Sequence, residues 1–106
     1  MAQALHFDHD GFSEALRKPG VLVVDFWATW CMPCKMLGPV IEQLAGAYDG
    51  RAVVGKVDID EQRALAEQYG IQSVPTVMVF KDGKAEETLV GVRPIDAFKN
   101  AIDRLL

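Results

Sequence analysis

Two valine-rich runs stand out from the mixed apolar and polar pattern of this 106-residue chain, VLVVDFW at 21–27 and AVVGKVDI at 52–59. Near-continuous apolar runs of this length are typical of strands that are covered on both faces of a sheet. Between the two runs, apolar residues recur at helical spacing, and Gly50 follows as a stop signal. The stripe comprises Met36, Leu37, Val40, Ile41, Leu44, Ala45 and Tyr48. The pattern therefore predicts a strand, a helix and a second strand in the middle of a sheet.

Helical and extended patterns continue to alternate along the rest of the chain. A second helix is predicted over 61–69, and an Asp-Gly turn signal within 76–90 predicts a hairpin. A last helix is predicted to begin near Pro94, and an edge strand and a short helix are predicted over 4–7 and 10–18. The apolar stripe of the last helix is Ile95, Phe98, Ile102 and Leu105. The order β-α-β-α-β-α-β-β-α favours an α/β fold, with a mixed sheet and helices on both faces.

Length and charge restrict the functions that the chain can have. A chain of 106 residues has room for one core, so residues 1–106 are expected to form a single domain with a single site. No apolar run approaches the ~18 residues of a membrane span, and we expect a soluble protein. The net charge is -4 with scattered basic residues, which argues against nucleic-acid or membrane partners. The first ten residues do not resemble a signal peptide, so a cytoplasmic location is expected.

The only two cysteines, Cys31 and Cys34, lie two residues apart in the stretch DFWATWCMPCKMLGP. A structural disulfide at this spacing would close a very small loop and would stabilise the fold little. A zinc site would require the two histidines, His6 and His9, as well. This pair precedes the cysteines and is more closely spaced than the histidines of most Cys2His2 sites. We therefore expect no metal site, and two surface histidines.

Position in the sequence favours a third interpretation, in which the cysteines are a reactive dithiol. Cys31 follows a buried strand and opens a helix, where unpaired N–H groups and the helix dipole favour a thiolate. Lys35 adds a cation nearby. Cys34 lies almost one turn further along, close enough to meet Cys31 but more buried. We expect one exposed nucleophile and one sheltered partner, which together can exchange disulfides.

The chain resembles the thioredoxin family over almost its whole length, from about residue 5 to residue 105. The resemblance rests on WATWCMPCK at 27–35, followed in order by SVPT at 73–76, FKDG at 80–83 and GVRP at 91–94. A Cys-x-x-Cys pair alone is weak evidence, but this succession of motifs is specific. The resemblance implies the thioredoxin fold, in which a central mixed five-stranded sheet is flanked by four helices.

The resemblance also implies an activity and its partners. The expected activity is that of a thiol-disulfide oxidoreductase, which reduces protein disulfides through a reversible Cys31–Cys34 disulfide and needs no bound cofactor. The expected partners are disulfide-containing client proteins and a flavoprotein thioredoxin reductase that is linked to NADPH. A monomer is expected.

Asp25 lies in the middle of an otherwise apolar run, where an isolated carboxylate is unfavourable unless it is paired or protonated. It is either an acid that reaches solvent near a strand end or a buried group whose pKa is raised by desolvation. The resemblance implies that Asp25 accepts the proton of Cys34, through water. It also implies that Lys56 lies near Asp25 and tunes it, although a lysine that extends to the surface is an equal interpretation.

An apolar rim around Cys31 is the client-binding surface that the resemblance implies. Its members are Trp30, Met32, Pro33, Ile59, Val74, Pro75, Gly91 and Val92. The resemblance further implies a cis peptide bond at Pro75, which leaves the backbone of Val74 free to pair with an extended client segment. Each residue alone would be ordinary core or surface, and only their convergence would make a docking face. Trp27 is assigned mainly to packing.

Met32 departs from the usual Trp-Cys-Gly-Pro-Cys motif of the family, in which glycine holds this position. Methionine adds flexible apolar contact area and an oxidisable thioether, and it restricts the backbone. Pro33, immediately before Cys34, accompanies reductants in this superfamily, so a reductase is expected. Three alternatives remain open, which are a disulfide oxidase or isomerase of the same fold, a noncatalytic thioredoxin-like binding subunit, and a zinc module.

Overall fold

The central strand of the protein is β2 (Val21–Trp27), which forms from the first valine-rich run and is buried over nearly its whole length. In the computed structural model, which describes residues 3–106, β2 pairs in parallel with β3 (Ala52–Asp58) and antiparallel with β4 (Thr76–Lys81). Two further strands extend the sheet, β1 (Leu5–His6) beside β3 and β5 (Lys84–Val90) beside β4. The order β1-β3-β2-β4-β5 is the mixed five-stranded sheet that was predicted.

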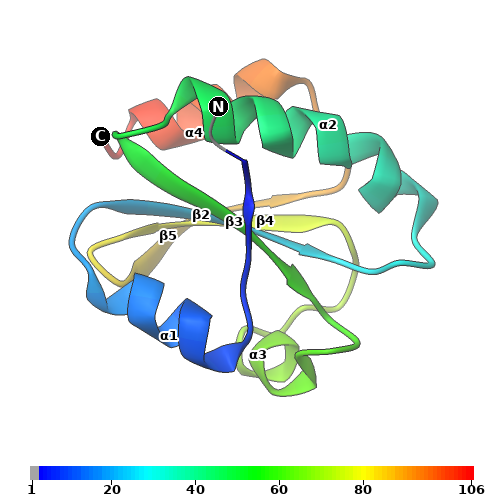
Figure 1. Ribbon diagram of the computed structural model, residues 1–106. Helices are drawn as coiled ribbons and strands as arrows, with labels where there is room; N and C mark the ends of the chain where they lie inside the picture. Colours follow the sequence, from blue (N-terminus) through cyan, green and yellow to red (C-terminus); the bar gives the residue numbers. More distant parts are fainter. Residues whose placement is uncertain (1–2) are drawn as a thin grey trace.

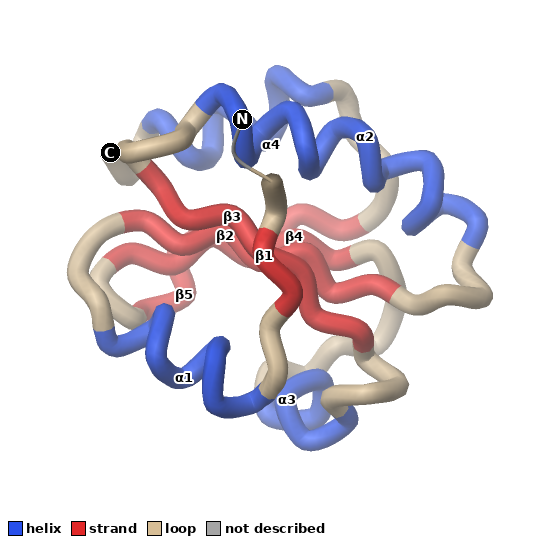
Figure 2. Tube along the Cα trace, in the orientation of Figure 1, coloured by secondary structure: helices blue, strands red, loops and turns tan. Residues whose placement is uncertain are grey.

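Helices cover both faces of this sheet (Figure 1 and Figure 2). On one face lie α2 (Met32–Ala47) and α4 (Ile95–Asp103), and on the other lie α1 (His9–Arg17) and α3 (Arg63–Gln68). The elements follow one another in the predicted order β-α-β-α-β-α-β-β-α. The α/β fold class with helices on both faces is therefore confirmed.

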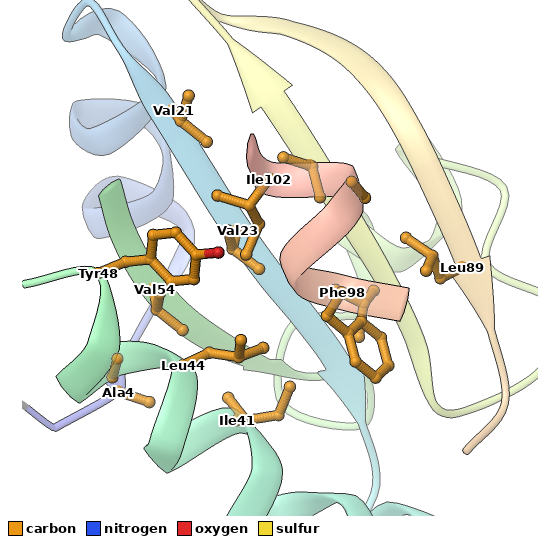
Figure 3. Packing of buried hydrophobic residues seen from close by; sticks show 14 of the residues in the cluster. Ala4, Val21, Val23, Ile41, Leu44, Tyr48, Val54, Leu89, Phe98 and Ile102 are labelled. Atoms are coloured by element: carbon orange, nitrogen blue, oxygen red, sulfur yellow. The ribbon is translucent and has the colours of Figure 1, made fainter. Parts of the chain in front are cut away.

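The core is divided in two by the sheet, because successive side chains of a strand point to opposite faces. Val21 and Val23 of β2 pack with the side chains of α2 and α4 (Figure 3). Leu22, Val24 and Phe26 pack in a second cluster beneath α1 and α3. This second cluster includes Phe7, Phe12, Leu65, Met78 and Phe80. By the same alternation, Asp25 points to the face that α2 and α4 cover.

The structure corrects several element boundaries and one predicted core position. The first helix begins at His9, earlier than predicted, because Asp8 caps it by accepting a hydrogen bond from the Gly11 N–H at 2.7 Å. The other shifts shorten the second and last helices by a residue or two at their ends. Met36 does not belong to the buried stripe of α2, since its side chain is 63% exposed. The buried stripe is completed by Cys34, Leu37, Ile41, Leu44 and Ala45.

Candidate functional site

Four chain segments converge at one end of the sheet. Trp27, the last residue of β2, pairs with Asp58 at the end of β3, and Phe26 pairs with Thr76 at the start of β4. The end of β5 lies at the same edge because Val90 also pairs with Thr76. The segments that adjoin these strand ends, at 28–34, 59–62, 73–75 and 91–94, carry the predicted site residues other than Asp25 and Lys56, which lie within β2 and β3. The fold thus gathers at one edge residues that are widely separated in the sequence.

The two cysteines stand at the start of α2 and form a disulfide, with a Cα–Cα distance of 5.3 Å. Cys31 is the N-cap residue, and its Sγ accepts a hydrogen bond from the backbone N–H of Cys34 at 3.2 Å. The predicted position of Cys31 at a helix N-terminus is therefore confirmed. Its predicted exposure is wrong for the disulfide form, because Cys31 is only 5% exposed and Cys34 only 2%.

Neighbouring loops explain why Cys31 is covered. Ala28 and the two cysteines form a small buried cluster against which Trp27, Ile59 and Val74 pack. The Sγ of Cys31 lies 3.7 Å from the carbonyl oxygen of Val74. The loop before β4 and the loop after β3 therefore both border the sulfur.

Asp25 is fully buried, and neither of its carboxylate oxygens has a hydrogen-bond partner among the described residues. Desolvation raises the pKa of Asp25 to about 7, while the positive charge of Lys56 acts in the opposite direction. The predicted burial and the predicted direction of the pKa shift are both confirmed. Because Asp25 points to the face covered by α2, its side chain lies on the same side of the sheet as Cys34.

Lys56 is the direct partner of Asp25 in the β2–β3 ladder, so both side chains lie on the same face of the sheet. Lys56 is half-buried, and its Nζ lies 4.7 Å from the centroid of the Trp27 ring. The two charged groups form no direct ion pair within the described chain. Lys56 therefore influences Asp25 through its charge, while the Trp27 ring contacts its ammonium group.

The residues of the predicted apolar rim differ in exposure. Trp30 is 68% exposed, Met32 65% and Val92 46%, and Pro33 is also exposed. Ile59, Val74 and Gly91 are half-buried, whereas Pro75 is buried. The Val74–Pro75 peptide bond is cis, as the family resemblance implied. The Gly91 N–H donates to the Pro75 carbonyl at 2.8 Å, which joins the loop after β5 to the loop before β4.

Asp60 is a site residue that the sequence reasoning missed. Its Oδ2 accepts a hydrogen bond from Nε1 of Trp30 at 2.9 Å, which fixes the exposed ring toward the loop after β3. The available signal was the pattern Asp58-Ile59-Asp60 at the end of a buried strand, since it places polar acceptors at the edge where the cysteines lie.

Both histidines are exposed, His6 in β1 and His9 at the first position of α1. Between residues 3 and 106, no group of three or more His, Cys, Asp or Glu side chains could hold a metal ion. None of the helices formed by these residues is both long enough and apolar enough to span a bilayer.

Comparisons with known proteins agree with this geometry. The sequence profile of the family described as Thioredoxin matches residues 3–104. The thioredoxin of Staphylococcus epidermidis is 49% identical over 87 residues, which are 82% of this chain and 84% of that protein. Thioredoxin 2 of Chlorobaculum tepidum is 46% identical over 96 residues, 91% of this chain and 88% of that protein.

Solved structures show the same likeness. A mutant thioredoxin from Halobacterium salinarum superposes with a TM-score of 0.90 at 39% identity, covering 97% of this chain and 90% of that chain. The thioredoxin of Malassezia sympodialis gives a TM-score of 0.90 at 36% identity, covering 99% of this chain and 92% of that chain.

Proposed function

This chain belongs to the thioredoxin family, and from that premise we propose how its cysteine pair reduces the disulfides of client proteins. Its activity is that of a thiol-disulfide oxidoreductase of the thioredoxin type. The observation that carries this function is the Cys31–Cys34 disulfide at the N-terminus of α2. We infer that residues 1–106 act as a single domain, because one sheet unites the described elements and one site lies at its edge.

In the first step, the thiolate of Cys31 attacks one sulfur of a client disulfide. A bond forms between Cys31 and that sulfur, the client S–S bond breaks, and the second client sulfur leaves as a thiolate that takes a proton. The N-cap position supports this role, since the backbone N–H of Cys34 points at Sγ of Cys31 and the helix dipole favours negative charge there.

In the second step, Cys34 loses its proton and attacks Sγ of Cys31. The Cys31–Cys34 disulfide forms, the mixed disulfide breaks, and the client leaves with both of its sulfurs reduced. Two electrons and, overall, two protons pass from the protein to the client. The step is intramolecular, and the closeness of the two sulfurs favours it over attack by any free thiol.

Asp25 is the proposed proton acceptor for Cys34, acting through water. Its support is a buried carboxylate with a pKa of about 7 on the face of the sheet that α2 covers. Lys56 tunes this acid, because its positive charge favours the ionised form.

The rim residues Trp30, Met32, Pro33, Ile59, Val74, Pro75, Gly91 and Val92 would bind an extended client segment. Val74 brings backbone groups beside Cys31, which supports pairing with a client backbone. We infer that a flavoprotein reductase linked to NADPH regenerates the dithiol, that no cofactor is bound, and that the monomer works in the cytoplasm.

Trapping of the mixed disulfide tests this function. The Cys34→Ser variant should accumulate a covalent complex with clients in cell extract, because Cys31 can attack but nothing resolves the product. The Cys31→Ser variant is the matched control and should trap nothing. Absence of any dithiothreitol-sensitive complex with Cys34→Ser would contradict the proposed function.

Equilibration with glutathione buffers separates a reductase from an oxidase or isomerase, with tryptophan fluorescence as the readout. Trp27 packs against the cysteine cluster and Trp30 directly precedes Cys31, so their fluorescence should report the redox state. A reductase should have a potential well below about -180 mV, the value of protein disulfide isomerase. A potential at or above that value would favour the oxidase or isomerase.

A further inference from the structure

Exposed apolar side chains are concentrated around the start of α2. Eight large apolar side chains of the described residues are exposed, and three of them, Trp30, Met32 and Met36, lie within seven consecutive positions. Met32 is 65% exposed and Met36 63%. Exposing two methionines beside each other leaves apolar surface in water, and such surface often marks a binding site.

Helical geometry places the two methionines on one face of α2. Residues four apart in an α-helix are neighbours on its surface, so Met32 and Met36 form a continuous ridge. The ridge begins immediately after Cys31 and follows the outer face of α2. It is distinct from the buried stripe, in which Cys34 and Leu37 face the core.

Trp30 directly precedes Cys31 and lies outside α2. Its indole N–H is held by Asp60, in the loop after β3, so the ring is anchored toward that loop and not along α2. The methionine ridge therefore extends the apolar rim from its member Met32 along α2 to Met36, so a client segment would reach Met36 only on its α2 side.

We propose that the ridge of Met32 and Met36 recognises clients that carry a bulky apolar side chain within about two residues of the attacked cysteine, on the side of the segment that lies over α2. This inference rests on the proposed disulfide reduction, because a client must dock at Cys31 before it can reach the ridge. The ridge is continuous with that docking point. Methionine side chains are flexible and polarizable, so the ridge adapts to different apolar partners without requiring one shape.

Two disulfide peptides that differ only in the residues beside the attacked cysteine provide the test. Both contain the same disulfide, and the residues that flank the attacked cysteine are leucine in one peptide and serine in the other. The value measured is the ratio of kcat/KM for the leucine peptide to kcat/KM for the serine peptide. The Met32→Gln, Met36→Gln double variant should lower this ratio by about fivefold to tenfold, because glutamine keeps the length of methionine and removes its apolar character.

Two further variants serve as controls. The Met32→Leu, Met36→Leu variant restores apolar contact and should keep the ratio within twofold of the wild-type value. Leu5→Gln changes a side chain that is 51% exposed in β1, outside the site, and should leave the ratio unchanged. Far-UV circular dichroism checks that each variant is folded.

The outcomes distinguish this inference from the proposed function. If the wild-type protein reduces neither peptide, the proposed function fails and the ridge fails with it. If the wild-type protein reduces both peptides but the glutamine variant changes the ratio by less than threefold, only the ridge is overturned. A fall of threefold or more that the leucine variant shares would also overturn it, because apolar contact would not be the cause.

Discussion

Desolvation raises the pKa of Asp25 to about 7, so this carboxyl group can exchange a proton near neutral pH, where an exposed aspartate is fully ionised. The two carboxylate oxygens have no protein hydrogen-bond partner within residues 3–106, and the positive charge of Lys56 lowers the pKa of Asp25, against the effect of desolvation. When Asp25 is ionised, its buried and unpartnered carboxylate does not stabilise the folded protein. The proposed transfer of a proton from Cys34 to Asp25 would give this buried position a purpose.

The first prediction concerns Asp25→Asn, which removes the proposed proton acceptor and keeps the shape of the side chain. Release of the client from the mixed disulfide should slow by at least about tenfold near pH 7, with little change in the attack by Cys31. In the wild-type protein the release rate should rise with pH through about 7, because Asp25 must be ionised to accept a proton. Stopped-flow fluorescence with a mixed-disulfide substrate measures both steps.

Lys56→Gln is the matched control for the dependence of the client release rate on pH. The charge of Lys56 lowers the pKa of Asp25, so its removal should move the inflection of the release rate to higher pH. Equal slowing of attack and release in Asp25→Asn would remove Asp25 from the proposed role.

A second prediction concerns the methionines themselves. Hydrogen peroxide should convert Met32 and Met36 to the sulfoxide well before Met78, because the first two are 65% and 63% exposed and Met78 is 7% exposed. The disulfide form should be used, so that the cysteines do not compete for peroxide. Peptide mass spectrometry after a peroxide time course measures each site, and equal rates at the three positions would contradict the exposures.

At the scale of elements, the sequence predicted every strand and helix of residues 3–106, most of them from the spacing of apolar residues and the hairpin of β4 and β5 from its Asp-Gly turn. The central strand was predicted at Val21–Trp27, which are its observed bounds. The end of a helix depends on single hydrogen bonds, such as the capping of α1 by Asp8, and periodicity does not report these. Met36 was wrongly predicted in the buried stripe of α2 because it is apolar and adjacent to Leu37. Successive residues of a helix point in different directions, and the Met36 side chain points toward solvent.

The candidate site was predictable only in part. The spacing and position of Cys31 and Cys34 indicated a dithiol at a helix N-terminus, and the residues around Asp25 indicated its burial. The contact between Trp30 and Asp60 joins two loops that are thirty positions apart, so the local pattern at 58–60 indicated acceptors at this edge but not this partner. The coverage of Cys31 by the Val74 loop likewise depends on the pairing of β2 with β4.

Packing between elements leads to a third prediction, on two glycines that lie in different surroundings. A Cβ added at Gly55 in β3 would clash with the ring of Phe7, whereas a Cβ at Gly46 in α2 would meet nothing within 4 Å. Gly55→Ala should therefore destabilise the protein by about 2 to 3 kcal/mol, because the buried Phe7 ring must move. Gly46→Ala should stabilise it by about 0.5 to 1 kcal/mol, since alanine favours the helix.

Urea unfolding of both variants measures these changes in the free energy of unfolding. The opposite signs are the informative part of the comparison, since both substitutions add the same methyl group. A destabilisation of Gly55→Ala below about 0.5 kcal/mol would show that Phe7 can move without cost.

At the scale of the whole molecule, the site and the stability of the fold depend on the same strand. β2 pairs with two neighbours at the centre of the sheet and contributes to both core clusters, so a charged group within it affects global unfolding. An ionised Asp25 must be desolvated in the folded state and is solvated in the unfolded chain. The free energy of unfolding should therefore report the titration of this one residue.

The fourth prediction is a loss of stability with rising pH that Asp25→Asn abolishes. The folded pKa of Asp25, about 7, is above its ordinary value of 3.8, so its contribution is fully present below pH 3.8 and is lost as pH rises through 7. Above pH 7 the wild-type protein should be less stable than Asp25→Asn, by about 4 kcal/mol at most at about 1.4 kcal/mol per pKa unit. The difference between the two proteins should vanish toward pH 4.

Urea unfolding of the disulfide form at intervals between pH 4 and pH 9 measures this difference. Subtracting the variant from the wild-type protein removes the other titrating groups, which both proteins share, and leaves the contribution of Asp25. A difference that is constant over this range would mean that Asp25 titrates alike in the folded and unfolded states. Its burial would then not raise its pKa, and its role as a proton acceptor near neutral pH would lose its physical basis.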